Sequence, residues 1–195
     1  IRRGRYRRMT DRFHHGLVIG KFYPLHAGHE YLIRTASDWC DIVTVVAMAS
    51  SVENIPLALR VGWLKEIFKE RHNVTIVGVM DNEPIDFHSD PVWSAHVAHM
   101  QTGVSEASAA RGKVAATKVD AVFTSENYGK ELARRFDAAH VCLDQGRVLY
   151  PVSGTAVRKQ PVGFWDALAP CVRAYLCQRI VIVGAESTGK TTLAE

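Results

Sequence analysis

Short apolar runs alternate with amphipathic stretches along this chain of 195 residues. The apolar runs are strand-sized and rich in β-branched residues, most clearly at 41–48. The amphipathic stretches carry apolar side chains at helical spacing, as at 56–70, where Pro56 stands near the expected start. This alternation predicts an α/β fold with a doubly wound, mostly parallel sheet. We expect strands at 17–19, 41–48, 74–79, 121–123, 141–143 and 180–183, and helices at 28–38, 56–70, 128–136 and 164–176.

One more helix is expected after Ser89-Asp90-Pro91, with Asp90 as its N-cap and Pro91 at its first position. Residues 102–118 are rich in Ala, Gly, Ser and Thr and contain few large apolar side chains. We expect the end of that helix there, followed by a mobile connector. Ligands of such sheets bind at the carboxyl ends of the strands, near the point where the strand order reverses. The loops that follow the strands are therefore the first place to look for chemistry.

The net charge of +4 comes from the start of the chain. Residues 1–12 contain six Arg and one Asp, whereas residues 13–195 contain 18 basic and 19 acidic side chains. A near-neutral globular part excludes a broadly basic nucleic-acid-binding surface as the main feature of the fold. No apolar run approaches the roughly 20 residues of a membrane span, and no apolar signal segment follows the basic start. The four Cys form no C-x-x-C pair, so we expect reduced thiols in a cytoplasmic protein.

The first candidate site is the segment Gly-Lys-Phe-Tyr-Pro-Leu-His-Ala-Gly-His at residues 20–29, between the first expected strand and helix. His26 and His29 fall on one side of a helix N-terminus, whose free N–H groups and partial positive charge suit phosphate. Lys21 adds a positive charge, and Gly28 allows a ligand close to the backbone. The segment predicts stabilisation of charge on a phosphoryl group. Ordinary capping histidines and a zinc pair are the alternatives, and no third zinc ligand is evident.

The second candidate site is Val-Ser-Gly-Thr-Ala-Val-Arg at residues 152–158, ahead of Pro161. We expect Ser153 to cap a short helix, with Thr155 in its first turn and Arg158 nearby. Hydroxyl groups, free N–H groups and a guanidinium together suit phosphate. By itself the segment is a capped helix turn, and its pairing with H-x-G-H upstream makes it specific.

The two motifs together resemble those of the nucleotidylyltransferase superfamily. Within it, the chain resembles the nicotinamide mononucleotide (NMN) adenylyltransferases of the archaeal and NadR type. Asp81-Asn82, Trp93-Ser94-Ala95-His96-Val97 and Ser125-Glu126-Asn127-Tyr128-Gly129 follow in the expected order and carry this narrower match. The resemblance covers residues 13–178 and implies a Rossmann-like sheet of the nucleotidylyltransferase type.

The resemblance also implies a reaction, in which an NMN 5′-phosphate oxygen attacks the α-phosphorus of ATP in line. NAD forms and diphosphate leaves, while the protein supplies positioning and charge stabilisation, helped by the Mg²⁺ that accompanies ATP. It implies catalytic contacts to phosphates from His26, His29, Lys21 and Arg158. It implies substrate binding by Gly20, Phe22, Tyr23, Gly28, Arg60, Asp81, Trp93, Ser125, Asn127, Ser153 and Thr155.

Two of these assignments have simpler alternatives. By resemblance Trp93 stacks on the flat, cationic nicotinamide ring, but a large aromatic side chain often fills a core instead. Arg60, near the start of the second helix, could reach a substrate phosphate or could be a solvated helix arginine.

The end of the chain contains a third motif, which starts at Gly184 and fits G-x-x-x-x-G-K-[ST] after the expected strand 180–183. In such a loop, Gly184 and Gly189 allow the backbone to cradle phosphates, Lys190 reaches the β and γ oxygens, and Thr191 binds Mg²⁺. In NadR-type proteins a ribosylnicotinamide kinase follows the adenylyltransferase. We therefore expect a basic tail (1–12), a nucleotidylyltransferase domain (13–178) and a truncated kinase start (179–195), with both ends of the chain cut.

Two other functions remain open from the sequence. A nucleotidylyltransferase acting on phosphopantetheine or FMN would share the two end motifs. A regulatory module that senses NAD and binds nucleic acid through the arginine-rich start is the second alternative, although residues 1–12 are too short for a helix-turn-helix domain. We expect ATP and NMN as partners, neither a membrane nor nucleic acid, and a homo-oligomer.

Overall fold

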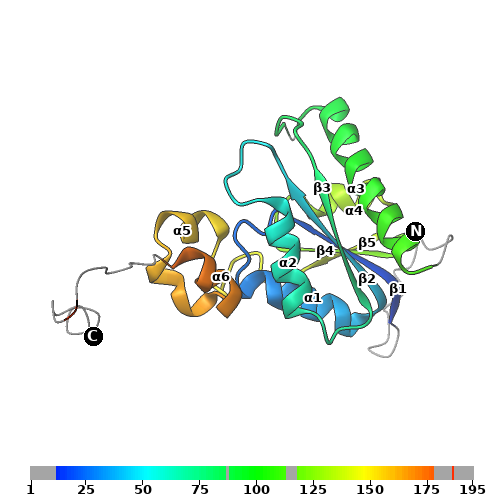
Figure 1. Ribbon diagram of the computed structural model, residues 1–195. Helices are drawn as coiled ribbons and strands as arrows, with labels where there is room; N and C mark the ends of the chain where they lie inside the picture. Colours follow the sequence, from blue (N-terminus) through cyan, green and yellow to red (C-terminus); the bar gives the residue numbers. More distant parts are fainter. Residues whose placement is uncertain (1–11, 87, 113–117, 178–185, 187–195) are drawn as a thin grey trace.

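The computed structural model describes residues 12–86, 88–112, 118–177 and Glu186. Over these residues five parallel strands form one sheet in the order β3-β2-β1-β4-β5 (Figure 1). The predicted α/β fold with a doubly wound parallel sheet is therefore confirmed. The strands are β1 (Phe13–Gly20), β2 (Cys40–Ala49), β3 (Val74–Met80), β4 (Ala121–Thr124) and β5 (Ala139–Cys142).

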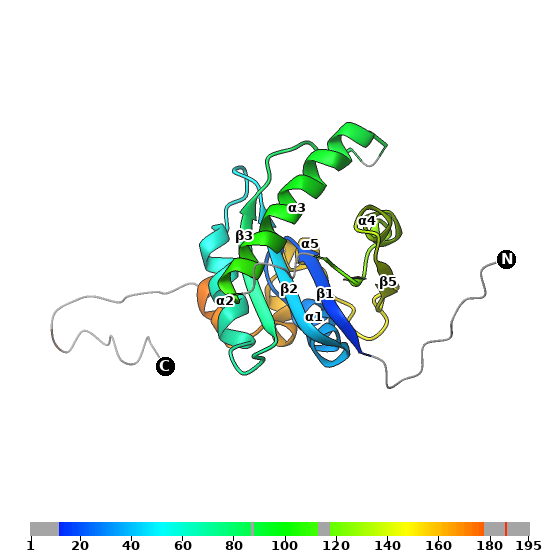
Figure 2. The same ribbon diagram turned by 90° about the vertical axis from the view of Figure 1, so that its right-hand side faces the viewer.

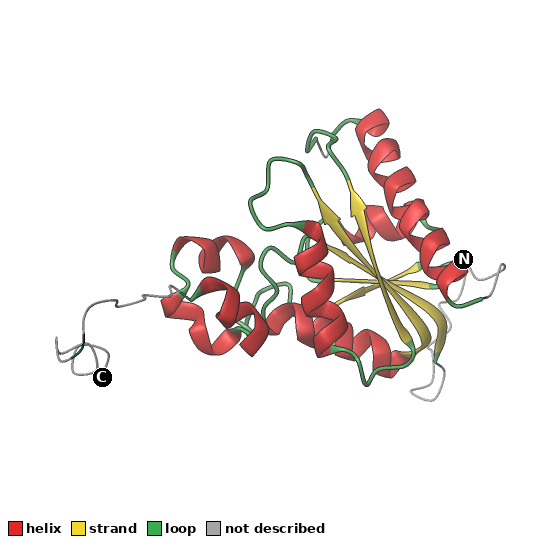
Figure 3. Ribbon diagram, in the orientation of Figure 1, coloured by secondary structure: helices red, strands yellow, loops and turns green. Residues whose placement is uncertain are grey.

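Helices cover both faces of this sheet (Figure 3). α1 and α2 pack on one face and α3 and α4 on the other, whereas α5 and α6 lie beside α1 and α2, away from the strands (Figure 1 and Figure 2). Among the described residues, no helix has the length and apolar character needed to cross a membrane. The helices are α1 (Ala27–Trp39), α2 (Leu57–Ile67), α3 (Asp90–Ala110), α4 (Gly129–Arg135), α5 (Gly154–Lys159), the 3-10 helix η1 (Val162–Ala167) and α6 (Pro170–Leu176).

Side chains of the central strands point alternately into the two cores. Val18 and Val45 belong to the core under α1 and α2, whereas Leu17 and Val46 belong to the core under α3 and α4. All four are fully buried. Because both faces are covered, the strands are apolar almost throughout, which is why they appear in the sequence as continuous runs.

The strand order reverses between β1 and β4. The chain runs from β1 outward to β2 and β3, and then crosses to the other side of β1 to form β4 and β5. The loops after β1 and β4 therefore leave in different directions, as they do at the ligand-binding edge of other doubly wound sheets.

The start of α3 differs from the prediction by one residue. Ser89 is the N-cap, and its hydroxyl accepts a hydrogen bond of 3.5 Å from the N–H of Val92. Asp90 is instead the first helical residue, and its carboxylate forms an ion pair with Arg135 of α4. Both residue types cap helices well, so a partner distant in sequence accounts for the difference.

The prediction for 102–118 is confirmed only in part, because α3 ends within this segment, at Ala110, but occupies more than half of it. Its small residues lie where the helix comes close to the sheet. A Cβ atom on Gly103 would lie 2.9 Å from a methyl carbon of Val46 and 3.0 Å from one of Val79. Small side chains here are a requirement of close packing and do not indicate a loop.

The single helix predicted at 164–176 is also wrong. η1 ends at Ala167, Leu168 is extended (φ −109°, ψ 136°), and α6 begins at Pro170. Proline lacks an N–H and disfavours helical backbone in the residue before it, which separates the two helices. The expected strand at 180–183 and the phosphate-loop residues Gly184, Gly189, Lys190 and Thr191 lie outside the described residues, as does the segment 1–11.

Candidate functional site

Two adjoining cavities lie at the carboxyl ends of the strands. The first, of about 400 Å³, is bounded by the loops after β1 and β4 and by the starts of α1 and α5. The second, of about 430 Å³, is bounded by the ends of β1, β2 and β3 and by α3. Gly20, Lys21 and Tyr128 line both cavities, so the two spaces share a rim directly after β1.

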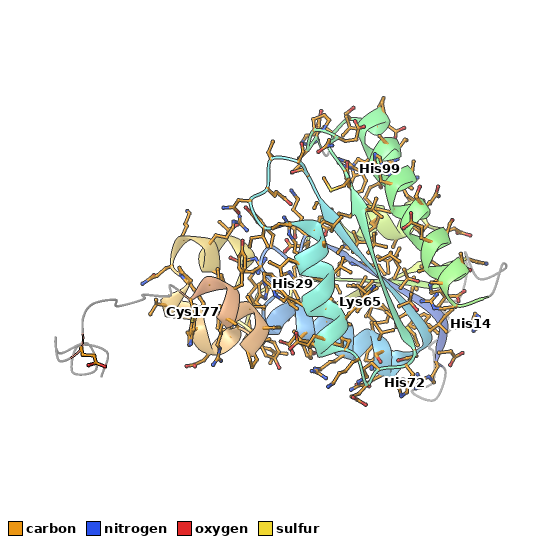
Figure 4. All side chains as sticks on the ribbon, viewed as in Figure 1. His14, His29, Lys65, His72, His99 and Cys177 are labelled. Carbon is orange, nitrogen blue, oxygen red and sulfur yellow. The ribbon has the colours of Figure 1, made fainter. Side chains whose placement is uncertain are left out.

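The first cavity contains the two motifs that lie more than 120 residues apart in the sequence. From the first motif it is lined by Gly20, Lys21, Phe22, Tyr23, His26, Gly28 and His29, and from the second by Ser153, Gly154, Thr155 and Arg158. Ser125, directly after β4, also lines it. Figure 4 labels His29, which lies at the side of the sheet nearest to α5 and α6. The structure therefore brings together most of the residues expected at the site.

Arg158 joins the second motif directly to the first. Its guanidinium donates a hydrogen bond to the carbonyl oxygen of Tyr23 and lies 4.2 Å from the centroid of the Tyr23 ring. Gly154 packs closely against the same carbonyl group, and a Cβ atom at this position would lie only 2.5 Å from the oxygen. Ser153 caps α5 as predicted, and its hydroxyl accepts from the N–H of Ala156 at 3.1 Å. The start of α5 is thus fixed against the loop that follows β1.

The two histidines of the first motif form a stacked pair. Their ring centroids are 3.7 Å apart with 22° between the planes. The Nδ1 atom of each is buried and has no hydrogen-bond partner among the described residues. His26 is the N-cap residue of α1, but its side chain makes no capping hydrogen bond. Unpaired buried nitrogens are costly, so this arrangement favours a role in ligand binding over simple capping.

Burial lowers the pKa of both histidines. It lowers the pKa of His26 to about 4, with a smaller contribution from the positive charge of Arg147. It also lowers the pKa of His29 well below its ordinary value, with His26 and Arg147 contributing. Both rings are therefore neutral near pH 7, when each has one N–H to donate. Within the described segments, no group of three or more His, Cys, Asp or Glu side chains is placed to hold a metal ion, so the alternative of a zinc site has no support there.

Arg147 is a cation of the first cavity that the sequence did not identify. Its guanidinium donates to the carbonyl oxygen of Val152 at 2.6 Å and to Glu126 Oε1 at 2.7 Å. Its loop is shaped by Asp144, whose carboxylate accepts hydrogen bonds from three successive backbone N–H groups, those of residues 148–150. An Asp-Gln-Gly turn after a strand was the available signal, since such loops line the ligand-binding edge of a parallel sheet.

Arg60 has neither of the two roles considered for it. Its side chain is fully buried and does not line either cavity. The guanidinium donates to the carbonyl oxygens of Ile55 and Lys21 and to Glu53 Oε2 at 2.7 Å. It therefore holds the loop before α2 against the loop after β1, and its donors are occupied by the protein itself.

The second cavity has apolar walls and an acidic edge. Met48, Trp93 and Met100 supply apolar surface, and Asp81 and Glu83 supply the acids. The Asp81 carboxylate pairs with His96 Nδ1, while His96 Nε2 lies 3.0 Å from the carbonyl oxygen of Pro84. This pairing fixes the loop after β3 to α3.

Trp93 belongs to a core and to a cavity at the same time. Only 6 % of it is exposed and it packs in the core between α3 and the sheet, yet it also lines the second cavity. The core-filling interpretation is thus correct without excluding contact with a ligand. Asn127, in contrast, lies outside both cavities. It lines a separate hollow with Trp93 and Glu131, and its side chain accepts a hydrogen bond from Gln145.

Comparison with known proteins gives a consistent family resemblance. No protein-family model matches the chain. The chain is 29 % identical to the trifunctional NAD biosynthesis/regulator protein NadR of Escherichia coli (strain K12), and 28 % identical to its counterpart in Salmonella typhimurium (strain LT2). Each match covers 91 % of this chain and 44 % of the relative, so the chain spans less than half the length of these curated proteins.

Solved structures of NadR proteins share the fold. One, in complex with NR, has a TM-score of 0.69 at 21 % identity, and another, in complex with NAD and AMP-PNP, has a TM-score of 0.67 at 23 % identity. They cover 94 % and 93 % of this chain, and the matched part is 51 % of each of those chains. The expected resemblance to NadR-type proteins and the expected sheet type are thereby confirmed.

Proposed function

We propose that this domain is a nicotinamide-nucleotide adenylyltransferase, which converts NMN and ATP into NAD and diphosphate. The observation that carries the proposal is the pair of cavities that meet at Gly20 and Lys21. One is lined by basic groups and neutral histidines, and the other by an indole ring and two acids. Two substrates bound in them would have their phosphate groups side by side at the shared rim.

The first cavity suits the triphosphate of ATP. Lys21, Arg147 and Arg158 provide positive charge, and two of them are arginines, which pair well with phosphate oxygens. Mg²⁺ enters as part of the MgATP substrate, because it keeps several water ligands and binds largely through the phosphates. The hydroxyls of Ser125 and Thr155 line the same space and add further hydrogen-bonding groups.

The reaction needs positioning and charge stabilisation more than proton transfer. The attacking phosphate oxygen of NMN is already ionised, and it forms the new bond to the α-phosphorus while the bond to the diphosphate oxygen breaks. Neutral His26 and His29 would each donate an N–H to phosphate oxygens as charge develops on them. Such donors act strongly in a site that excludes water, and their rings are held in place by stacking.

The second cavity suits the nicotinamide part of NMN. The indole ring of Trp93 offers a flat surface for a cationic pyridinium ring. Asp81 and Glu83 place two carboxylates at the edge of the cavity, and Lys21, the one Lys or Arg side chain among the described residues that line it, lies at the rim shared with the first cavity. A carboxylate in place of the carboxamide would therefore meet like charge, which supports NMN over its deamidated form.

For the complete protein we also propose a ribosylnicotinamide kinase. The support is the phosphate-loop pattern at residues 184–191, which lies after an apolar run as this motif requires.

The test is an assay of the purified chain with ATP and each candidate substrate, read as diphosphate release, with NAD from NMN confirmed as NADH after alcohol dehydrogenase is added. We expect kcat/KM at least tenfold higher with NMN than with deamidated NMN, and no product from FMN or phosphopantetheine. No NAD from folded protein would refute the proposal, and a preference for FMN or phosphopantetheine would support the alternative nucleotidylyltransferase.

A further inference from the structure

A carboxylate lies in the wall of the cavity that we assign to a polyphosphate. Glu53, in the loop between β2 and α2, lines the first cavity, and only 8 % of its side chain is exposed. A negative charge beside phosphates opposes binding unless it is compensated. Its presence there therefore requires an explanation in terms of what it holds.

Glu53 is compensated by two cations on two sides. Its Oε1 atom accepts from Lys21 Nζ at 2.8 Å, and its Oε2 atom accepts from Arg60 Nη1 at 2.7 Å and from the N–H of Ser50 at 3.3 Å. Burial by itself would raise the pKa of Glu53, but the hydrogen bonds from Lys21 and Arg60 outweigh it and lower the pKa. The carboxylate is therefore ionised, and the three side chains together carry one positive charge.

The two cations differ in how firmly they are held. Arg60 is fully buried, and backbone carbonyls fix it, whereas the side chain of Lys21 is 51 % exposed. An exposed ion pair usually contributes little, because both long side chains must be ordered to make it. Here Glu53 is already ordered from behind by Arg60, so only Lys21 has to be fixed.

Lys21 is the cation that lines both cavities. Its ammonium group therefore lies where the phosphate of one substrate approaches the α-phosphate of the other. A lysine free in solution samples many rotamers, and fixing it in advance lowers the barrier to a reaction that depends on positioning. Glu53 is the residue that fixes it.

We propose that Glu53 is a positioning residue for adenylyl transfer, which holds the Lys21 ammonium at the rim shared by the two cavities. The catalytic part of this statement rests on the proposed function, whereas the holding of Lys21 does not. The two parts are therefore tested by separate measurements.

The first measurement is a double-mutant cycle on NAD formation, with Glu53→Gln, Lys21→Met and the double variant. We expect Glu53→Gln to lower kcat at least tenfold in the native background and less than twofold in the Lys21→Met background. KM for ATP should not rise, since a negative charge leaves the cavity. Equal losses in both backgrounds, or a raised KM with unchanged kcat, would overturn the proposal.

The second measurement does not depend on activity. Acetylation of lysines by a limiting N-hydroxysuccinimide ester, followed by peptide mass spectrometry, reports how freely each amine reacts. We expect Lys21 to react at least fivefold faster in Glu53→Gln than in the wild type, while exposed Lys65 (Figure 4) is unchanged. An unchanged Lys21 rate refutes the holding of Lys21. A raised rate in a protein that makes no NAD refutes the proposed function alone.

Two further variants control for folding. Glu70→Gln, at an exposed position beyond α2, removes the same charge outside the cavity and should leave both measurements at wild-type values. Glu53→Asp keeps the charge beside Arg60 but withdraws it from Lys21, so it serves if Glu53→Gln fails to fold. We expect Glu53→Asp to lower kcat severalfold in the native background and to leave kcat unchanged in the Lys21→Met background. Equal effects of Glu53→Asp on kcat in the two backgrounds would also overturn the proposal.

Discussion

Gly154 gives a sharp test of how the two motifs are assembled. A Cβ atom at this position would lie 2.5 Å from the carbonyl oxygen of Tyr23, whereas ordinary contact begins at 3.4 Å. In Gly154→Ala the start of α5 and the loop after β1 must therefore separate by up to 0.9 Å. Neither partner is a flexible side chain, so the movement is transmitted to backbone and also weakens the hydrogen bond from Arg158 to Tyr23.

Two effects follow from that displacement. Overpacking of this kind costs about 1–3 kcal/mol of the free energy of unfolding, which corresponds to a loss of about 2–12 °C in Tm for a domain of this size. A misplacement near 1 Å at a site that works by positioning costs on the order of 10²-fold in rate. We therefore expect Gly154→Ala to fold and to make NAD about two orders of magnitude more slowly.

Gly62→Ala is the matched control. Gly62 lies on the exposed side of α2, and a Cβ atom there has nothing within 4 Å. Replacing a helical glycine by alanine at an open position stabilises by about 0.5–1 kcal/mol, so Tm should rise slightly while NAD formation is unchanged. Thermal unfolding by circular dichroism and the NAD assay measure both variants. If Gly154→Ala retains Tm and more than half of wild-type activity, the close contact between α5 and the loop after β1 is not real.

Three further predictions concern individual side chains. His29→Ala should lower kcat by about 10²–10³-fold through the loss of one preorganised donor, with little change in Tm, whereas exposed His72→Ala should leave kcat unchanged; near-normal turnover of His29→Ala would refute its role. The pKa of His26 is about 4 in the folded protein against 6.5 ordinarily, so between these pH values the unfolded chain binds more protons than the folded one. The free energy of unfolding should therefore fall as the pH falls from 6.5 to 4, by about 3 kcal/mol for this group. Urea unfolding across this range should show a shallower pH dependence in His26→Gln, and an identical slope would contradict the lowered pKa. Trp93→Ala should raise KM for NMN at least tenfold without raising KM for ATP, and should also cost about 3–5 kcal/mol in urea unfolding because Trp93 packs in a core; an unchanged KM would leave Trp93 a core residue only.

The parts of the fold that could be predicted are those set by local periodicity. Strands such as 41–48 are buried on both faces, so they appear in the sequence as continuous apolar runs, and the alternation with helices fixes the class of the sheet. The two candidate phosphate-binding motifs could also be recognised in the sequence, because each combines a strand or cap with polar side chains at short spacing. Their meeting in one cavity follows from the point where the strand order reverses.

The parts that could not be predicted depend on partners distant in sequence. Arg60 was expected either to reach a phosphate or to be solvated, and its burial depends on acceptors that the helical pattern does not reveal, the carbonyls of Ile55 and Lys21 and the carboxylate of Glu53. The small residues around Gly103 resembled a linker because the sequence does not show the tertiary contact with Val46 that requires a small residue there. Arg147 was missed because it lies far from the first motif in the sequence. Only the folded loop brings its charge close enough to lower the pKa values of His26 and His29.

The central position of β1 also has a consequence for the order of events when the protein is made. β1 is the first of the five described strands to be synthesised, and β2, which pairs with one of its edges, follows directly after α1. Its other edge is covered only by β4, about 105 residues later, where the Asp120 carboxylate also accepts the N–H of His15 at 3.0 Å. Until then the central strand of the sheet has an open edge, the kind of surface through which nascent chains associate wrongly. Closing so long a loop is slow and costs entropy. The pairing of β4 that ends this exposure is also the step that brings Ser125 to the end of β1, so protection from aggregation and the first assembly of the site arrive together.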